Sequence, residues 1–186
     1  KNAAYLAALS QALETKDSLL VSWLKPVDDI PAFINCQYLF IRLPEVFYCS
    51  VTKNLITEWI DKILSRKRVT VSGNKPLRLI GRHLLVQMTA AAALKCLANP
   101  GFDRTYKLAA NGETSLFELV GFIHSTLARL LPNHNFAKLI FAEEEPVRLS
   151  EEFDTSFMEN FNVILPGWRT GVEETIVAYL VHRKLF

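Results

Sequence analysis

The chain has 186 residues, half of them apolar, which suffices for one sizeable core and excludes extended disorder. Its 21 basic and 19 acidic residues leave a net charge of +2, so no global field would draw nucleic acid or an anionic membrane surface. The three cysteines, Cys36, Cys49 and Cys96, are widely spaced and indicate neither a disulfide framework nor a zinc site, which favours a reducing cytoplasm.

The longest apolar stretch covers residues 84–98 and includes Gln87, Thr89 and Lys95. It is too short to span a bilayer, so we expect a buried helix there. The first twenty residues show no basic end ahead of an apolar core, so no secretory signal is visible. The start at Lys1 instead of a methionine suggests a fragment, a processed chain or part of something longer.

Residues 3–15 are rich in good helix formers, and their leucines share one face, which predicts a helix. The pattern breaks up between residues 16 and 31, and the apolar run at 33–43 then predicts a strand covered on both faces. Asn54 is placed to cap a helix that ends at Ser65 and has an apolar period of 3.6 residues.

The elements continue after that helix with a short strand at 68–75 that ends in a Ser-Gly-Asn turn. Beyond the Ala-rich helix, a stop at 98–103 precedes a strand at 104–109. Ser115 and Glu118 have the capping-box spacing ahead of another helix, which Pro132 would end.

The last part of the chain is expected to hold a strand at 137–142, an acidic loop at 143–152 and a brief helix capped by Asp154. Thr170 and Glu173 repeat the capping-box spacing at the last helix. The alternation of helices and strands predicts one compact α/β unit over residues 1–186.

No strong catalytic motif is present in the sequence. The glutamates of the acidic loop are expected to form a solvated charge run, so we predict no metal site. Arg78 and Arg82 follow a Gly-Asn turn and precede the Ala-rich helix, where a guanidinium can fork onto a phosphate. Plain solvent exposure also explains these two arginines. Four histidines lie far apart and are assigned structural or surface roles: His83, His124, His134 and His182.

From Phe40 to its end the chain resembles the C-terminal half of the extended short-chain dehydrogenase/reductase family, the NAD(P)-dependent nucleotide-sugar epimerases and dehydratases. The order of segments carries the resemblance: "IRLPEVF", "NLITEWIDKIL", "VTVSGN", "GRHLLVQMTAAAALKCLANP", "RTYKLAANGETSLFELVGFI" and "PGWRTGVEETIVAYL". It implies an α/β fold in which residues 1–50 are a residual Rossmann edge and residues 51–186 a substrate-binding subdomain.

The resemblance also implies site residues. Asn54 and Leu55 would open the helix that holds the diphosphate of a nucleotide sugar, and a helix N-terminus suits an anion. Residues 69–72 would line the base. Arg82 would bind the diphosphate, with Arg78 as second choice. Lys1 takes the place of the catalytic lysine, whose tyrosine partner would precede it; Tyr5 follows Lys1 and is no substitute.

The sequence departs from the family pattern at the strand end. An Asn-Val-Tyr-Gly run is replaced by Glu45, Val46, Phe47 and Tyr48, so a carboxylate and a bulky ring stand where an amide and a glycine are usual. A carboxylate that faces a diphosphate would repel it. Two aspartates of the pattern are likewise replaced by His83 and Thr89. These departures argue against tight nucleotide-sugar binding.

The resulting expectation is the substrate-binding half of a nucleotide-sugar epimerase or dehydratase, not catalytic by itself. NAD or NADP would enter only through an N-terminal Rossmann half supplied in cis or in trans, because the Gly-rich turn is absent here. The other partners implied are a nucleotide sugar or related small molecule and a second copy of the chain, with no nucleic acid and no membrane. The first helix would sit at that homodimer interface by resemblance, although packing against the core explains its leucine face equally well. Two alternatives stay open: part of an NADPH-dependent thioester reductase, and a non-catalytic scaffold or regulatory subunit.

Overall fold

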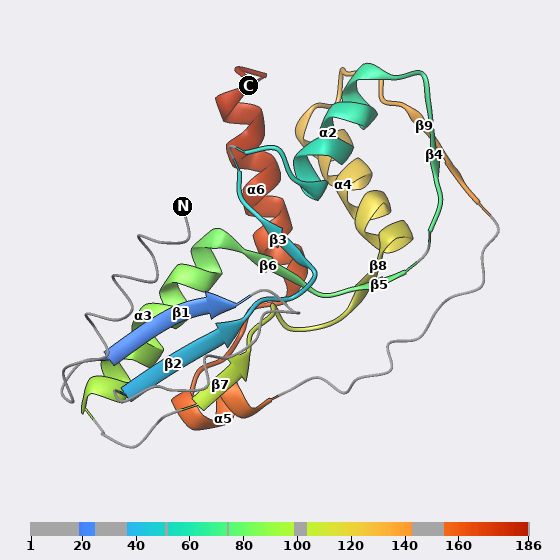
Figure 1. The fold of residues 1–186 in the computed structure, drawn as a ribbon. Helices are drawn as coiled ribbons and strands as arrows, with labels where there is room; N and C mark the ends of the chain where they lie inside the picture. Colours follow the sequence, from blue (N-terminus) through green and yellow to red (C-terminus); the bar gives the residue numbers. More distant parts are fainter. Residues whose placement is uncertain are drawn as a thin grey trace, which may run out of the picture. The chain divides into compact units, whose positions relative to one another are not determined.

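The computed structural model describes residues 19–24, 37–50, 52–73, 75–98, 104–142 and 155–185, and it has mixed α/β structure (Figure 1). The elements in chain order are β1 (Leu19–Leu24), β2 (Gln37–Arg42), β3 (Val46–Tyr48), α2 (Leu55–Ser65), β4 (Arg68–Val71), β5 (Pro76–Leu77), β6 (Leu79–Gly81), α3 (Arg82–Ala98), β7 (Arg104–Lys107), β8 (Thr114–Ser115), α4 (Leu116–Leu130), β9 (Lys138–Phe141), α5 (Ser156–Phe161) and α6 (Trp168–His182).

The chain divides into two compact units, and each is built from separate stretches of sequence. The first comprises Lys1–Pro44, Leu85–Leu108 and Asp154–Ile164, and the second Glu45–Leu84, Ala109–Phe153 and Leu165–Phe186. The boundary at residue 50 that the sequence suggests stays a prediction about domains.

The first unit contains a parallel sheet with the strand order β1-β2-β7, in which Val21 lies opposite Leu39 and Ile41 opposite Tyr106. Three consecutive residues of the central strand, Leu39, Phe40 and Ile41, are buried. This confirms the prediction of a strand covered on both faces, because successive side chains of a strand point to opposite sides.

Strand β1 is an element that the sequence analysis missed, since the pattern between residues 16 and 31 was expected to be irregular. Its six residues, "LLVSWL", are a short apolar run that contains a serine. The prolines and aspartates that follow are typical of loops, so the whole stretch was interpreted as irregular. The structure ties the strand to α3 by a hydrogen bond from the Trp23 indole Nε1 to the Thr89 hydroxyl, 3.0 Å long. The helix expected at residues 3–15 lies outside the described residues.

Helix α3 was expected to be buried, and it is buried on one face only. Leu85, Thr89, Ala92 and Cys96 lie inside, whereas its opposite face carries apolar residues that are exposed: Val86, Leu94 and Leu97. Within the described ranges, no helix is long and apolar enough to cross a membrane.

The second unit packs α2, α4 and α6 around one apolar core. Buried aliphatic residues recur along each helix at the spacing of one face, which is the pattern that predicted these helices. The core positions include Ile56, Ile60 and Ile63 of α2, Leu119, Ile123 and Leu127 of α4, and Val172, Ile176 and Leu180 of α6. Short strand pairs complete the unit: β3 with β6 and β4 with β9, both parallel, and β5 with β8, antiparallel.

The predicted helix starts hold in part. Ser115 caps α4 by accepting from the Glu118 backbone N–H, and α4 ends at Leu130, before Pro132. The predicted start at Thr170 is wrong, because α6 begins at Trp168, whose buried ring and N–H bond to the Asn111 carbonyl fix an earlier first turn. Helix α5 follows Thr155; the cap expected at Asp154 lies outside the described residues.

Candidate functional site

The candidate site lies where β3 and β6 end side by side. These strands are parallel and in register, with Phe47 opposite Ile80 and Tyr48 opposite Gly81. Helix α3 begins directly after Gly81, and α2 begins after a loop of six residues that follows Tyr48. Because parallel strands share one carboxyl edge, two helix N-termini start from the same edge of this pair. Each carries the partial positive charge of a helix N-terminus, although in α2 the N–H groups of Ile56 and Thr57 are bonded to the Asn54 side chain.

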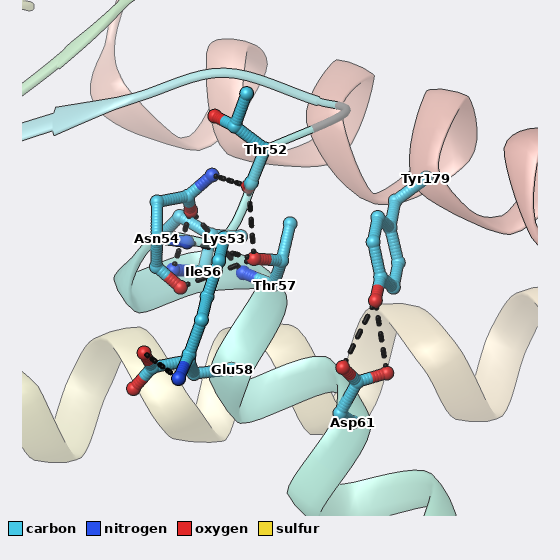
Figure 2. Close-up of polar contacts among 8 residues, drawn as sticks. All are labelled: Thr52, Lys53, Asn54, Ile56, Thr57, Glu58, Asp61 and Tyr179. Atoms are coloured by element: carbon cyan, nitrogen blue, oxygen red, sulfur yellow. Dashed lines mark hydrogen bonds and ion pairs between the residues drawn. The ribbon is translucent and has the colours of Figure 1, made fainter.

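Asn54 forms the cap of α2, as predicted. Its Oδ1 accepts from the N–H groups of Ile56 and Thr57, at 2.9 and 3.2 Å, while its own N–H donates to the Thr57 hydroxyl at 3.0 Å (Figure 2). The amide nitrogen donates to the carbonyls of Cys49 and Thr52, at 2.6 and 2.7 Å. The Asn54 side chain therefore uses its acceptor and both donor hydrogens within the protein.

Thr57 is the residue of this cap that the sequence analysis did not name. It supplies the second half of a capping box, in which the cap side chain and the side chain three residues later each bind the other's backbone. The Asn-x-x-Thr spacing was the available signal. The box closes the loop between β3 and α2 and fixes where the N-terminus of α2 stands.

Arg82, the first residue of α3, has an exposed side chain that makes no hydrogen bond or ion pair with the residues described. An exposed guanidinium at a helix N-terminus is disfavoured by the dipole, so its position offers little to stability. Leu55 opens α2 and packs partly against the core of the second unit. Arg82 is therefore the site residue whose polar groups are open to a ligand.

Arg78 is held differently from Arg82. Its side chain is 11% exposed and its Nη2 donates to the Glu113 carboxylate at 3.0 Å. A ligand phosphate would have to compete with that carboxylate.

Tyr48 is nearly fully buried and fills the space between two glycines. A Cβ built on Gly81 would lie 3.0 Å from its ring, and one on Gly171 would lie 2.5 Å from its hydroxyl oxygen. Burial, and secondly the Glu174 carboxylate, hold the pKa of this phenol well above its ordinary value. The bulky ring at the position of a family glycine is thus accommodated by glycines elsewhere.

Glu45 is exposed at the amino end of β3. The strand separates it from the carboxyl edge by three residues, or about 10 Å. Repulsion between this carboxylate and an anion at that edge is therefore weaker than the sequence suggested.

The remaining residues that the sequence analysis named have structural roles or lie outside the residues that the structure describes. Thr89 is buried; it donates to the Leu85 carbonyl and accepts from Trp23, so its hydroxyl has a packing role. In the strand expected to line a base, Val69 and Val71 point into the core. Lys1, Tyr5 and the acidic loop lie outside the described residues.

The histidines and acidic residues do not assemble a metal site within the described ranges, where no group of three or more His, Cys, Asp or Glu side chains could hold an ion. The rings of His124 and His134 instead pack at steep angles against the Phe136 ring, with centroids 5.7 and 5.1 Å away. Their aromatic contacts agree with the structural roles assigned from the sequence.

No model of a known protein family and no curated protein matches the sequence. Solved structures match the fold. UDP-N-acetylglucosamine 4-epimerase from Bacillus cereus superposes with a TM-score of 0.57 at 13% identity, over 81% of this chain and 47% of that one. dTDP-4-dehydrorhamnose reductase from Bacillus anthracis, in complex with NADP, gives 0.56 at 18% identity, over 75% and 47%. dTDP-glucose 4,6-dehydratase from Bacillus anthracis, in complex with NAD, gives 0.55 at 14%, over 80% and 46%.

The predicted α/β fold class is confirmed, because the fold of this chain is similar to that of part of solved nucleotide-sugar epimerases, dehydratases and reductases. It spans about half the length of the solved structures it matches. At these sequence identities the similarity shows the fold alone, and any function has to be argued from the residues of the site.

Proposed function

We propose that the chain is the C-terminal, substrate-binding half of an NAD(P)-dependent nucleotide-sugar epimerase- or dehydratase-like protein, and that it binds the diphosphate of its ligand at the carboxyl edge of β3 and β6. The observation that carries this proposal is the placement of Arg82 and two helix N-termini at one edge. A guanidinium forks onto a phosphate, and the positive ends of helix dipoles attract one. The N–H groups of Ile56 and Thr57 are already bonded to Asn54, so α2 contributes chiefly through its dipole.

The two ends of the edge have different roles in this proposal. Asn54 spends its side-chain hydrogen bonds on the cap, so it positions the N-terminus of α2 instead of touching the ligand. Arg82 makes the charged contact. Arg78 supports the edge through Glu113 and is a weaker candidate for direct contact.

The cofactor of this class does not fit the residues present here. A dinucleotide needs a Gly-rich turn between a strand and a helix, and the seven glycines of this sequence form no such motif. The nicotinamide, which carries the hydride in such enzymes, would be held by a Rossmann half in cis or in trans. We accordingly assign no hydride step to this chain, and propose a cytoplasmic setting from its cysteine usage.

A non-catalytic scaffold is the second candidate, and the burial of Tyr48 favours it. The ring occupies volume beside Gly81, directly before the first residue of α3. A fold that no longer binds a ligand would tolerate the Tyr48 ring at this position. A working site would require that the ring does not occupy the space of the bound sugar.

A thermal-shift titration with UDP-, dTDP- and GDP-sugars separates the two candidates. A ligand at ten times its Kd stabilises the folded state by about 1.4 kcal/mol, which raises the Tm of a chain this size by roughly 3–6 °C. Arg82→Ala should abolish that shift. Arg66→Ala is the matched control, because Arg66 is an exposed arginine at the opposite end of α2 and should leave the shift intact.

Two results would count against the substrate-binding proposal. One is an equal shift in the Arg82→Ala and Arg66→Ala variants, which would place the ligand elsewhere. The other is no shift with any of the three sugars at roughly 10 mM, a concentration at which even millimolar binding is visible, and this result would favour the scaffold.

A further inference from the structure

We propose that the outer edge of β9, together with the basic side chains beside it, binds an extended acidic peptide of a partner protein as an added β-strand. We call this surface the basic edge and define it by Arg66, Lys67, Arg68, Lys138 and Ile140. All five residues are exposed and belong to the second unit. The basic edge shares no residue with the candidate site at the carboxyl edge of β3 and β6.

The first observation is that β9 has an open edge among the described residues. It pairs in parallel with β4, and within the described ranges no strand lies on its other side (Figure 1). The Lys138 N–H donates to the Lys67 carbonyl at 3.0 Å. Because the residues that bond to one neighbour alternate along a strand, the backbone groups of Leu139 and Phe141 point away from β4. Such an edge is a template for another strand.

The second observation is that the positive charges of the basic edge lie close together without compensation. Arg68 and Lys138 are register partners on neighbouring strands, about 4.8 Å apart, and both are exposed. Like charges in such positions repel each other. Arg66 and Lys67 add two more charges directly before β4. None of these four residues is in an ion pair with another residue that the structure describes.

Ordinary structural roles explain only two of these charges. Arg66 is the C-cap of α2, where the helix dipole favours a cation. A lysine on an edge strand, as at Lys138, discourages two sheets from pairing edge to edge. Neither role accounts for Lys67, or for Arg68 beside Lys138, a placement that raises the free energy of the unbound protein. An anionic partner at this edge would remove that repulsion.

The apolar residues of β9 define the partner further. Ile140 and Phe141 are 42% and 43% exposed. Ile140 lies on the same face of the strand as Lys138, about 7 Å farther along, because side chains alternate between the two faces. The edge is therefore basic at its start and apolar at its end. A peptide that is acidic at one end and apolar at the other is complementary to it.

Nucleic acid is the competing anionic partner. Single-stranded nucleic acids bind where a cationic groove is combined with aromatic rings on which the bases stack. The basic edge contains no aromatic residue, and the neighbouring Phe141 ring packs edge-on against Phe117, with centroids 5.2 Å apart. The outward backbone groups of β9 match the hydrogen-bonding groups of a peptide backbone instead. These features favour a peptide over a nucleic acid.

Fluorescence anisotropy with the full chain and labelled peptides tests the proposal. The probes are Glu-Glu-Glu-Val-Thr-Val and its reverse, which cover the parallel and antiparallel directions of an added strand. We expect at least one of them to bind with a Kd between about 10 μM and 1 mM, as for a short contact. Binding should weaken in about 0.5 M NaCl, because the charges are exposed.

Charge-reversal variants test which surface is responsible. Lys138→Glu should weaken peptide binding about tenfold or more, since it places a carboxylate against the acidic end of the peptide. Lys53→Glu is the matched control, because Lys53 is 84% exposed at the start of α2, about 16 Å along this helix from the basic edge. Far-ultraviolet circular dichroism checks that both variants are folded.

A methylated peptide tests whether the peptide is bound as a strand. The same sequence with every backbone nitrogen methylated cannot donate hydrogen bonds to the carbonyls of β9, so it should bind about tenfold more weakly or less. Undiminished binding of the methylated peptide overturns the added strand.

The absence of binding by either peptide at up to about 1 mM protein overturns the proposal, as does equal weakening by Lys138→Glu and Lys53→Glu. Tighter binding of a single-stranded oligonucleotide of roughly twelve nucleotides, weakened by Lys138→Glu, would overturn the peptide in favour of nucleic acid. None of these results depends on nucleotide-sugar binding, so the test is independent of the function proposed above.

Discussion

The hydroxyl oxygen of Tyr48 occupies the place of a side chain on Gly171: a Cβ at that glycine would lie only 2.5 Å from it. On its other side the same ring leaves a Cβ at Gly81 only 3.0 Å. The Tyr48 ring is therefore tightly packed between Gly81 of β6 and Gly171 of α6. Two glycines with negative φ are needed here for space and not for backbone freedom, since neither has the positive φ seen at Gly73 and Gly112.

Gly171→Ala should therefore destabilise the protein, although alanine is the better helix former. Overpacking a filled core costs typically 1–3 kcal/mol, against a helix-propensity gain of about 1 kcal/mol, so we expect a net loss of roughly 1 kcal/mol in urea unfolding. Gly121→Ala in α4 is the control, because nothing lies within 4 Å of a Cβ there and the variant should gain stability. Equal stabilisation by both alanines would mean that the Tyr48 ring moves aside at little cost, and that its close approach to Gly171 does not affect stability.

Alkaline pH should weaken the fold through Tyr48. Burial raises the pKa of its phenol in the folded protein, whereas in the unfolded chain it ionises near pH 10. Above that pH the unfolded state releases a proton that the folded state keeps, so stability falls by about 1.4 kcal/mol per pH unit until the folded pKa is reached. Below pH 10 this contribution is constant.

The measurement that checks this pH dependence is urea unfolding of the wild type and Tyr48→Phe at pH 8, 9, 10 and 11. The difference between them should change in favour of the phenylalanine variant only above about pH 10. Parallel curves up to pH 11 would mean that the Tyr48 phenol titrates as in water. Comparing the two proteins cancels the titration of their other groups.

The helices of the second unit were predictable from the sequence because their apolar period is long and their ends carry local signals. Asn54 and Ser115 each cap the helix they were expected to cap. The start of α6 was not predictable from such signals, since it depends on a bond from the Trp168 N–H to Asn111, a residue far away in the chain.

The candidate site was only partly predictable for a related reason. The position of Arg82 after a turn and before a helix made it a candidate phosphate ligand from the sequence alone. The sequence did not show that Arg78 is already paired with a carboxylate, because its partner Glu113 lies 35 residues away in the chain. The glycines that accommodate Tyr48 are similarly remote: Gly81 and Gly171 meet the ring only in the folded chain. Spacing along the chain carries no information on either contact.

Asn54→Ala should cost about 0.5–2 kcal/mol of stability, the range measured for losing a side-chain cap. Asn54→Ser keeps an oxygen for the cap but loses the hydrogen bonds that the amide donates to the Cys49 and Thr52 carbonyls. The stability of this variant should therefore lie between those of the wild type and Asn54→Ala. Thr155→Ala provides a control at an N-cap whose side chain makes no cap hydrogen bond, and we expect it to change stability by less than about 0.5 kcal/mol. A loss at Thr155 as large as at Asn54 would contradict this account.

Asp61 and Tyr179 join α2 to α6, and their coupling can be measured directly. The Tyr179 hydroxyl donates to Asp61, with oxygens 3.0 and 2.9 Å away, and burial together with this bond raises the pKa of the phenol (Figure 2). A double-mutant cycle of Tyr179→Phe and Asp61→Asn, followed by urea unfolding, should give a coupling free energy of about 1.5–3 kcal/mol, as for hydrogen bonds to charged groups. Arg183 approaches the same carboxylate at 3.5 Å but is exposed, so Arg183→Ala should cost about 0.5 kcal/mol or less. Coupling near zero, or an equal cost for Arg183→Ala and Tyr179→Phe, would show that charge and not the phenol links the two helices.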